Sequence, residues 1–146
     1  MEKKFTVPGE PTGKGRPRFS KQGNFIRTYT PEKTVSYENL VKLEYERQCG
    51  GEPFQKDMPL FIRIDAFYPI PKSASKKKTA EMLENRLRPT KKPDADNVLK
   101  IIADSLNGIA YHDDSQIVSC EMHKYYGEIP RINITIRSEE TNEGSI

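Results

Sequence analysis

The order of hydrophobic and polar residues predicts a chain that alternates between strands and helices. Apolar residues recur at every second position over residues 60–68 and 132–136, which is typical of a strand with one buried face. Residues 4–7, 24–29 and 116–126 are also predicted to be strands. The last of these is expected to pair antiparallel with 132–136, the strand that follows it.

Apolar residues at three- and four-residue intervals predict three helices. The first begins at Thr30 and Pro31, which suit the N-cap and the first helical position, and it ends at the glycine pair 50–51. The second, over residues 75–88, is polar nearly all round and is therefore expected to be exposed. The third, over residues 94–107, is the clearest, because one broad apolar face lies opposite a polar one.

Length and composition predict one domain. A chain of 146 residues is the usual size of a single domain and can bury a hydrophobic core. We expect an α+β (mixed α/β) fold, with helices flanking a mixed β-sheet, over residues 1–137, followed by a polar, flexible C-terminal tail at 138–146. Residues 8–21, rich in glycine, proline and basic side chains, are expected to form a loop, with a flexible basic arm at 14–18.

The sequence lacks the signatures of several classes of protein. No apolar run approaches the roughly 18 residues that span a membrane, and the N-terminus has no apolar signal core. Cys49 and Cys120 stand far apart without a Cys-x-x-Cys pair, which argues against a structural zinc site and thioredoxin-like chemistry. We therefore expect a cytoplasmic protein with reduced cysteines and no membrane partner.

Charge is distributed unevenly along the chain. The 24 basic and 21 acidic residues give a net charge of +3, but residues 1–92 carry 20 basic and 11 acidic side chains, whereas residues 93–146 carry 4 and 10. Two basic clusters, at 11–27 and 72–92, suit a polyphosphate partner, because each phosphate contact releases counterions. Each cluster could instead be an ordinary solvated face.

Acidic residues form two pairs on either side of the third predicted helix. Asp94 and Asp96 lie at its start, and Asp113 and Asp114 follow about twenty residues later. Hard divalent cations such as Mg²⁺ prefer carboxylate oxygens, so the chain is expected to fold back and bring both pairs to one ion. Such an ion would polarise a phosphodiester and activate water, and Lys100 could stabilise the charge that develops.

Each of these residues also has an ordinary structural interpretation. Asp94 or Asp96 could cap the helix, and residues 113–115 could form a simple turn. Lys100 could be the surface partner of Asp96 or Asp104, which lie four residues away on either side. Spacing alone does not decide between these interpretations and a metal site.

One extended motif combines these residues. It begins Asp94-Ala95-Asp96-Asn97-x-x-Lys100-x-x-x-Asp104-x-Leu106-Asn107-Gly108 and continues with Asp113-Asp114-Ser115-Gln116-Ile117. This motif resembles the RusA family of Holliday junction resolvases, which prophages often carry. The arm at residues 13–18 and the helix start at 29–31 also look like phage-borne members, so the resemblance spans roughly residues 5–137.

The resemblance implies a RusA-like fold and a homodimeric endonuclease that depends on Mg²⁺, for which Mn²⁺ can substitute. Such an enzyme nicks two strands of a four-way DNA junction symmetrically, in DNA recombination and repair. By resemblance, the catalytic residues are Asp94, Asp96, Asp114 and Lys100, and the metal ligands are Asp94, Asp96, Asp113 and Asp114. The DNA-binding residues would be Lys14, Arg16, Arg18, Arg86, Arg88, Lys91 and Lys92.

Two other functions remain open from the residues alone. The first is a non-catalytic DNA-binding dimer in which the acidic residues are structural. The second is a metal-dependent nuclease that acts on other branched DNA, such as flaps, or on RNA. A small-molecule phosphohydrolase is less favoured, because two separate basic segments exceed what one small phosphate needs.

Overall fold

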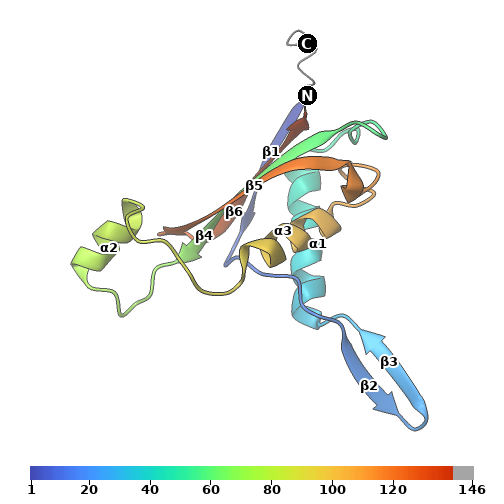
Figure 1. The fold of residues 1–146 in the computed structure, drawn as a ribbon, viewed down its shortest axis with the longest axis horizontal. Helices are drawn as coiled ribbons and strands as arrows, with labels where there is room; N and C mark the ends of the chain where they lie inside the picture. Colours follow the sequence, from blue (N-terminus) through green and yellow to red (C-terminus); the bar gives the residue numbers. More distant parts are fainter. Residues whose placement is uncertain (140–146) are drawn as a thin grey trace.

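A four-stranded mixed sheet forms the centre of the molecule (Figure 1). The computed structural model describes residues 1–139. In their order across the sheet, the strands are β1 (Glu2–Pro8), β6 (Arg131–Ser138), β4 (Leu60–Pro69) and β5 (Ile117–Gly127). β6 runs antiparallel to both β1 and β4, whereas β5 is parallel to β4. The predicted fold class, a single domain with a mixed sheet and flanking helices, is confirmed.

The neighbours of β6 differ from the prediction. β6 follows β5 in the chain but pairs with β4 and β1, so the predicted antiparallel pairing of these consecutive strands is wrong. Residues 128–130 instead cross the end of β4, a distance of two strand spacings, or about 10 Å. The four virtual bonds from Gly127 to Arg131 reach about 13 Å, which is enough. Consecutive strands are neighbours in only about two-thirds of cases, and an alternating pattern does not identify the exceptions.

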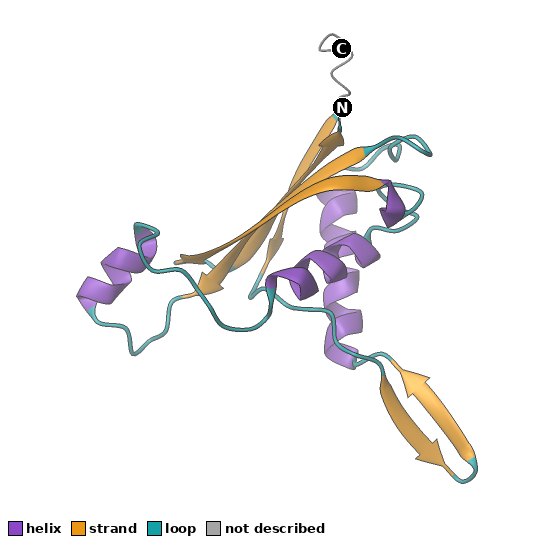
Figure 2. Ribbon diagram, viewed as in Figure 1, coloured by secondary structure: helices purple, strands orange, loops and turns teal. Residues whose placement is uncertain are grey.

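Two helices pack on one face of the sheet, and a third lies outside it (Figures 1 and 2). Helices α1 (Glu32–Gln48) and α3 (Ala95–Ser105) lie on this face, and α3 runs opposite in direction to β5. Helix α2 (Lys76–Leu83) projects beyond the end of β4. All three predicted helices are present. The second is shorter than the predicted 75–88, because the backbone turns at Asn85, where φ is 64°.

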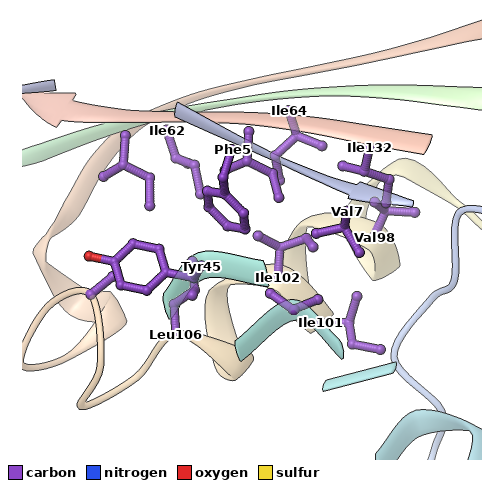
Figure 3. Packing of buried hydrophobic residues seen from close by; sticks show 14 of the residues in the cluster. Phe5, Val7, Tyr45, Ile62, Ile64, Val98, Ile101, Ile102, Leu106 and Ile132 are labelled. Atoms are coloured by element: carbon purple, nitrogen blue, oxygen red, sulfur yellow. The ribbon is translucent and has the colours of Figure 1, made fainter. Parts of the chain in front are cut away.

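The hydrophobic core lies between the sheet and helices α1 and α3 (Figure 3). Alternate positions of β4 and β6 point into it, as does one face of α3. Its deeply buried side chains from these elements and from the end of α3 are Leu60, Ile62, Ile64, Ala66, Ile132, Ile134, Ile136, Val98, Ile101, Ile102 and Leu106. Burial of this apolar stripe determines how α3 is rotated about its axis, and therefore which way its polar face points.

A separate two-stranded sheet projects from the body of the molecule (Figure 2). It is a hairpin of β2 (Arg18–Gln22) and β3 (Phe25–Tyr29), and it extends beyond the start of α1. The strand predicted over 24–29 is confirmed, but the loop predicted over 8–21 is wrong for its last residues, which form β2. The reason is that the hairpin lies outside the core: every residue of β3 is exposed, so burial imposes no alternating pattern on the hairpin.

The C-terminal boundary of the sheet lies close to its predicted place. Ser138 completes β6, one residue beyond the domain end predicted at residue 137. The backbone N–H of Glu139 donates to the carbonyl of Pro59 at 2.9 Å. The rest of the predicted tail, residues 140–146, lies outside the described residues. Among the described residues, no helix is long and apolar enough to cross a bilayer.

Truncation of Ile102 tests the placement of the core. The side chain of Ile102 is fully buried on α3, so Ile102→Ala should leave a cavity and lower the free energy of unfolding by about 2–5 kcal/mol. Urea unfolding followed by circular dichroism measures the change. Ile129→Ala is the matched control: its side chain is 70% exposed, so the change should cost less than about 0.5 kcal/mol. Equal losses for the two variants would contradict the described packing.

Candidate active site

The first acidic pair lies at the start of α3. Asp94 occupies the N-cap position, but its side chain accepts no capping hydrogen bond, and Asp96 lies in the first turn. Both residues are exposed, and within residues 1–139 neither carboxylate has a hydrogen-bond or ion-pair partner. The capping interpretation is therefore not observed for Asp94. Two carboxylates with unused oxygens lie two residues apart.

Lys100 lies one helical turn after Asp96, so the two side chains share one side of α3. Lys100 is exposed, and in the part of the chain that the structure describes it forms no ion pair with Asp96 or Asp104. Asp104 is instead paired with Lys14, at 3.4 Å. The surface-pair interpretation of Lys100 is therefore not observed, and its charge is available beside the first acidic pair.

The second acidic pair is shaped by a short 3-10 helix, η1 (Asp114–Gln116). The Asp113 carboxylate accepts the backbone N–H of Ser115 at 3.1 Å, and the Gln116 side chain accepts the backbone N–H of Asp113 at 3.1 Å. The turn interpretation is thus correct for Asp113, which caps η1. Asp114 is held by Asn107, whose side-chain oxygen accepts its backbone N–H at 2.7 Å.

The surroundings of Asp114 favour its protonated form. Burial raises the pKa of the Asp114 carboxyl above its ordinary value, and the negative charges of Asp113 and Asp104 raise it further. Burial, together with the negative charges of Asp114, Asp104 and Asp113, raises the pKa of the Tyr111 hydroxyl. Asp113 differs, because its hydrogen bond from Ser115 lowers its pKa. Negative charge is therefore concentrated around Asp114, where a cation would relieve the repulsion.

The two acidic pairs lie at opposite ends of α3. Asp104 follows Asp96 by eight residues, which corresponds to about 12 Å along the helix axis at a rise of about 1.5 Å per residue. Asp114 lies near Asp104, because the charge of Asp104 raises the pKa of the Asp114 carboxyl. Within residues 1–139, no three His, Cys, Asp or Glu side chains come together in a group that could hold a metal ion. The prediction that the chain folds back to bring all four acids to one ion is therefore wrong for a single protomer.

An open groove runs beside Asp94, between residues 10–18 and the starts of α1 and α3. Its volume is about 880 Å³. Four exposed basic residues line it, namely Arg16, Arg18, Lys33 and Lys92. Positive walls next to a carboxylate suit a phosphodiester held beside a metal ion. Lys33 was not predicted, because nothing in its local sequence distinguishes it from any other exposed helical lysine.

The basic arm packs closely against the body of the protein at two glycines, Gly13 and Gly15. A Cβ at Gly13 would lie 3.0 Å from the Cβ of Pro93 and 3.1 Å from the Cβ of Asn97. The backbone N–H of Gly15 donates to the Thr34 hydroxyl at 3.1 Å, and a Cβ at Gly15 would overlap that hydroxyl. The prediction of a flexible arm is therefore wrong for these residues, which pack against the starts of both α1 and α3.

Lys14 forms ion pairs with two helices. Its ammonium group lies 3.1 Å from the Glu38 carboxylate of α1 and 3.4 Å from the Asp104 carboxylate of α3. Burial opposes the charged form of Lys14, but the two carboxylates outweigh it and raise its pKa. Its charge is therefore matched inside the protein. Lys14 therefore positions the arm, a role that the sequence did not predict for this residue.

The second basic cluster lies along the end of β5. The Arg88 guanidinium lies 4.4 Å from the centre of the Tyr125 ring, and its Nε donates to the carbonyl of Lys124 at 2.6 Å. The Lys124 ammonium in turn donates to the carbonyl of Lys91 at 2.6 Å. These contacts hold the segment that leads from α2 to α3. All four predicted DNA-binding residues of this cluster are exposed: Arg86, Arg88, Lys91 and Lys92.

Comparison with known proteins places the chain in a family. The family model described as Endodeoxyribonuclease RusA matches residues 8–137. The chain belongs to the RusA family. The uncharacterized protein YqaN of Bacillus subtilis (strain 168) is 39% identical over 136 residues, which cover 92% of this chain and 94% of that protein. The crossover junction endodeoxyribonuclease rusA of Lactococcus phage r1t is 29% identical over 137 residues, which cover 93% and 96% of the two chains.

RusA membership confirms the resemblance carried by the Asp-x-Asp-Asn-x-x-Lys motif, and with it endodeoxyribonuclease activity. In this RusA chain, the first acidic pair lies at the start of α3, where Asp94 lines the groove, and Lys100 follows Asp96 by one helical turn. The second acidic pair lies at the other end. The assignment of individual catalytic and metal-binding residues stays a prediction.

Neutralising Asp114 should stabilise this RusA chain. Its raised pKa means that its charge opposes folding at neutral pH, so Asp114→Asn removes the cost of partly burying that charge, together with its repulsion by Asp113 and Asp104. We expect the free energy of unfolding to rise by no more than about 1 kcal/mol, the scale of a near-surface charge pair. The gain should disappear as the pH falls and Asp114 becomes protonated. Thermal unfolding at neutral and acidic pH measures both effects.

Asp113→Asn is the control of opposite sign. The pKa of Asp113 is lowered and its carboxylate caps η1, so its charge favours folding and the variant should be less stable at neutral pH. That loss should shrink as acid protonates the Asp113 of the unsubstituted chain. An increase in stability for both variants would contradict the described difference between the two carboxylates.

Proposed function

We propose that this chain is a Mg²⁺-dependent, structure-selective endodeoxyribonuclease that resolves four-way DNA junctions by paired symmetric nicks. The observation that carries the proposal is the position of Asp94 in the wall of a basic groove of about 880 Å³, with Asp96 two residues later in the first turn of α3 and with unused oxygens on both carboxylates. Family membership supports nuclease chemistry, and the phage r1t relative is named as a crossover junction enzyme. We expect it to act in the cytoplasm, in DNA recombination and repair.

The chemistry of the first acidic pair fits a hard divalent cation. Mg²⁺ prefers carboxylate and water oxygens, and Mn²⁺ accepts the same ligands. Asp94 and Asp96 offer such oxygens without competing partners among the described residues. When bound, the ion would supply Lewis-acid activation of the phosphodiester and of water. Two ligands from one protomer leave room for further carboxylates.

The basic side chains around this pair would position the DNA. The four exposed basic residues of the groove would bind the phosphate backbone, and Lys14, which also lines it, would fix the arm that carries Arg16 and Arg18. Lys100 would place a positive charge beside Asp96, where negative charge develops during strand cleavage. The exposed Arg86, Arg88 and Lys91 would extend the positive surface along the end of β5.

The separation of the acidic pairs favours a site shared between two copies. β5 is an edge strand within residues 1–139, and α3 runs in the opposite direction, so Asp94 lies towards the C-terminal end of β5 and Asp114 at its N-terminal end (Figure 1). Antiparallel pairing of β5 with the same strand of a second copy would bring unlike ends together. We therefore propose a homodimer in which Asp114 of the partner subunit, with the partner's Asp113, completes the ligand set of Asp94 and Asp96.

A two-fold dimer also suits the substrate. Its two composite sites would act on two strands related by the near two-fold symmetry of an open four-way junction. Each nick would leave a 5′-phosphate and a 3′-hydroxyl, ends that can be ligated.

Asp96→Asn tests the catalytic assignment. The variant should bind a synthetic four-way junction as the unsubstituted chain does, since Asp96 contributes no positive charge, but its cleavage in Mg²⁺ should fall by at least about 100-fold, beyond the effect of most outer-shell changes. Gel assays with junction, duplex, flap and single-stranded DNA measure both properties. Glu128→Gln, an exposed acidic residue outside the groove, is the control.

The same assays separate the alternative functions. Native-rate cleavage by Asp96→Asn would contradict the assignment of the metal site. Absence of cleavage by the unsubstituted chain in Mg²⁺ or Mn²⁺ would favour a non-catalytic DNA-binding dimer. Equal rates on flaps and junctions would favour a nuclease for branched DNA in general.

Mixed dimers test whether the ligands come from two copies. Asp96→Asn and Asp114→Asn should each be inactive alone, but in a heterodimer one composite site would carry both substitutions and the other would carry none. An equimolar mixture, refolded together, should therefore regain about a quarter of the native sites and produce single nicks. If the ligands lay within one copy, no mixed dimer would contain an intact site and the mixture would stay inactive. An inactive mixture would therefore contradict the shared site. It would not contradict the nuclease activity, which the unsubstituted chain reports.

A further inference from the structure

The projecting β2–β3 hairpin carries aromatic and arginine side chains on one face. Its antiparallel register pairs Arg18 with Tyr29 and Ser20 with Arg27. Residues that lie opposite each other share a face, as do residues two apart along a strand, so Phe25 lies on the same face as Arg27. We call Arg18, Phe25, Arg27 and Tyr29 the aromatic–arginine face.

The rings of this face do not contribute to the core. Phe25 is 76% exposed and Tyr29 is 48% exposed. An isolated two-stranded hairpin is at best marginally stable in water, and clustered apolar side chains at the surface are typical of binding sites. Phe19 and Ile26 on the opposite face are exposed as well, so exposure alone does not choose between the faces. The two arginines beside Phe25 and Tyr29 distinguish this face as a surface that another molecule covers.

The charge of the hairpin favours an anionic partner. Residues 11–31 contain no acidic side chain and five basic ones, Lys14, Arg16, Arg18, Lys21 and Arg27. Arg18 also lines the basic groove beside Asp94, so the aromatic–arginine face continues the surface proposed to bind DNA. Aromatic rings interleaved with cationic side chains bind nucleic acids by stacking on bases and contacting phosphates.

The spacing along β3 suits bases that are not stacked on one another. Phe25, Arg27 and Tyr29 follow one another on the face at intervals of about 7 Å. Because Arg27 lies between them, the two rings are about 14 Å apart, roughly four times the rise of 3.4 Å per nucleotide in duplex DNA. The bases of an intact duplex already stack on their neighbours, so the rings cannot insert without opening the duplex. A strand with opened bases, as at the branch point of a junction, leaves the base faces available.

We infer that the aromatic–arginine face binds unstacked DNA bases at the branch point of the substrate. Phe25 and Tyr29 stack on bases, while Arg18 and Arg27 contact adjoining phosphates. The inference rests on the proposed function for its substrate, but it concerns recognition and not cleavage: the hairpin makes the enzyme prefer branched to duplex DNA. Two copies of this face packed together would juxtapose like charges, which disfavours self-association through the hairpin.

Single tryptophans test base contact directly, because the chain contains no tryptophan. In Phe25→Trp, the indole fluorescence should be quenched by a four-way junction or a single strand, and it should change little with a duplex of equal length. The titrations are made in EDTA, which prevents metal-dependent cleavage. Phe19→Trp is the matched control: Phe19 is 73% exposed but lies on the opposite face of the hairpin, so its fluorescence should not respond.

Affinity provides a second measurement. The double variant with Phe25→Leu and Tyr29→Leu keeps the apolar bulk of the face but removes its rings. Its affinity for the junction and for the single strand should fall about tenfold or more, whereas its affinity for the duplex should stay within about twofold. Phe25→Trp with Tyr29→Trp, which restores rings, should bind all three DNAs as the unsubstituted chain does.

Three results would overturn the inference. Equal quenching in Phe25→Trp and Phe19→Trp, or equal loss of affinity for all three DNAs, would indicate a general contact with the DNA backbone. A concentration-dependent shift of the Phe25→Trp emission without DNA would indicate that a second copy covers the face. None of these measurements needs cleavage, so their failure is distinguishable from failure of the proposed nuclease function, which the Asp96→Asn assay reports.

Discussion

The packing of α3 against the sheet determines where the chemistry of this protein can take place. Val98, Ile101 and Ile102 are fully buried, and each buried apolar side chain of this size contributes about 1.5–3 kcal/mol. The helix therefore cannot rotate without exposing its apolar face. This constraint holds the first acidic pair at the start of α3, while the second lies near Asp104, about 12 Å further along the helix than Asp96. Their separation is a property of a rigid helix, and the proposed dimer follows from it.

The start of α3 also organises the basic arm. Gly13 allows the backbone to approach Pro93 and Asn97, and Lys14 joins the arm to Glu38 and Asp104. The charge of this lysine is balanced within the protein, whereas the arginines two and four residues later stay exposed in the groove. Neighbouring basic residues thus have different roles, because only one of them faces two carboxylates. The same contacts of Gly13 and Lys14 fix the segment from which the β2–β3 hairpin projects.

Local patterns predicted most elements of the fold, and their failures have physical causes. The helix over 94–107 was predictable because one of its faces is buried, and so were the half-buried strands. The strand at 18–22 was missed because every residue of its partner strand β3 is exposed, so burial imposes no alternating pattern on the hairpin. The glycines of the arm indicated flexibility, yet in the structure they permit close packing. The neighbours of β6 were wrong because alternation does not encode which strand lies alongside.

The sequence by itself determined the class of fold, the carboxylates and lysine of the motif, and the family, because residue identity and short-range spacing persist whatever the chain does elsewhere. Only the tertiary structure decided that the acidic pairs lie apart, that Lys14 is an internal ion-pair partner and that Lys33 joins the groove. These properties depend on which distant segments become neighbours. Such neighbours are selected by burial of the whole core, and no local spacing records them.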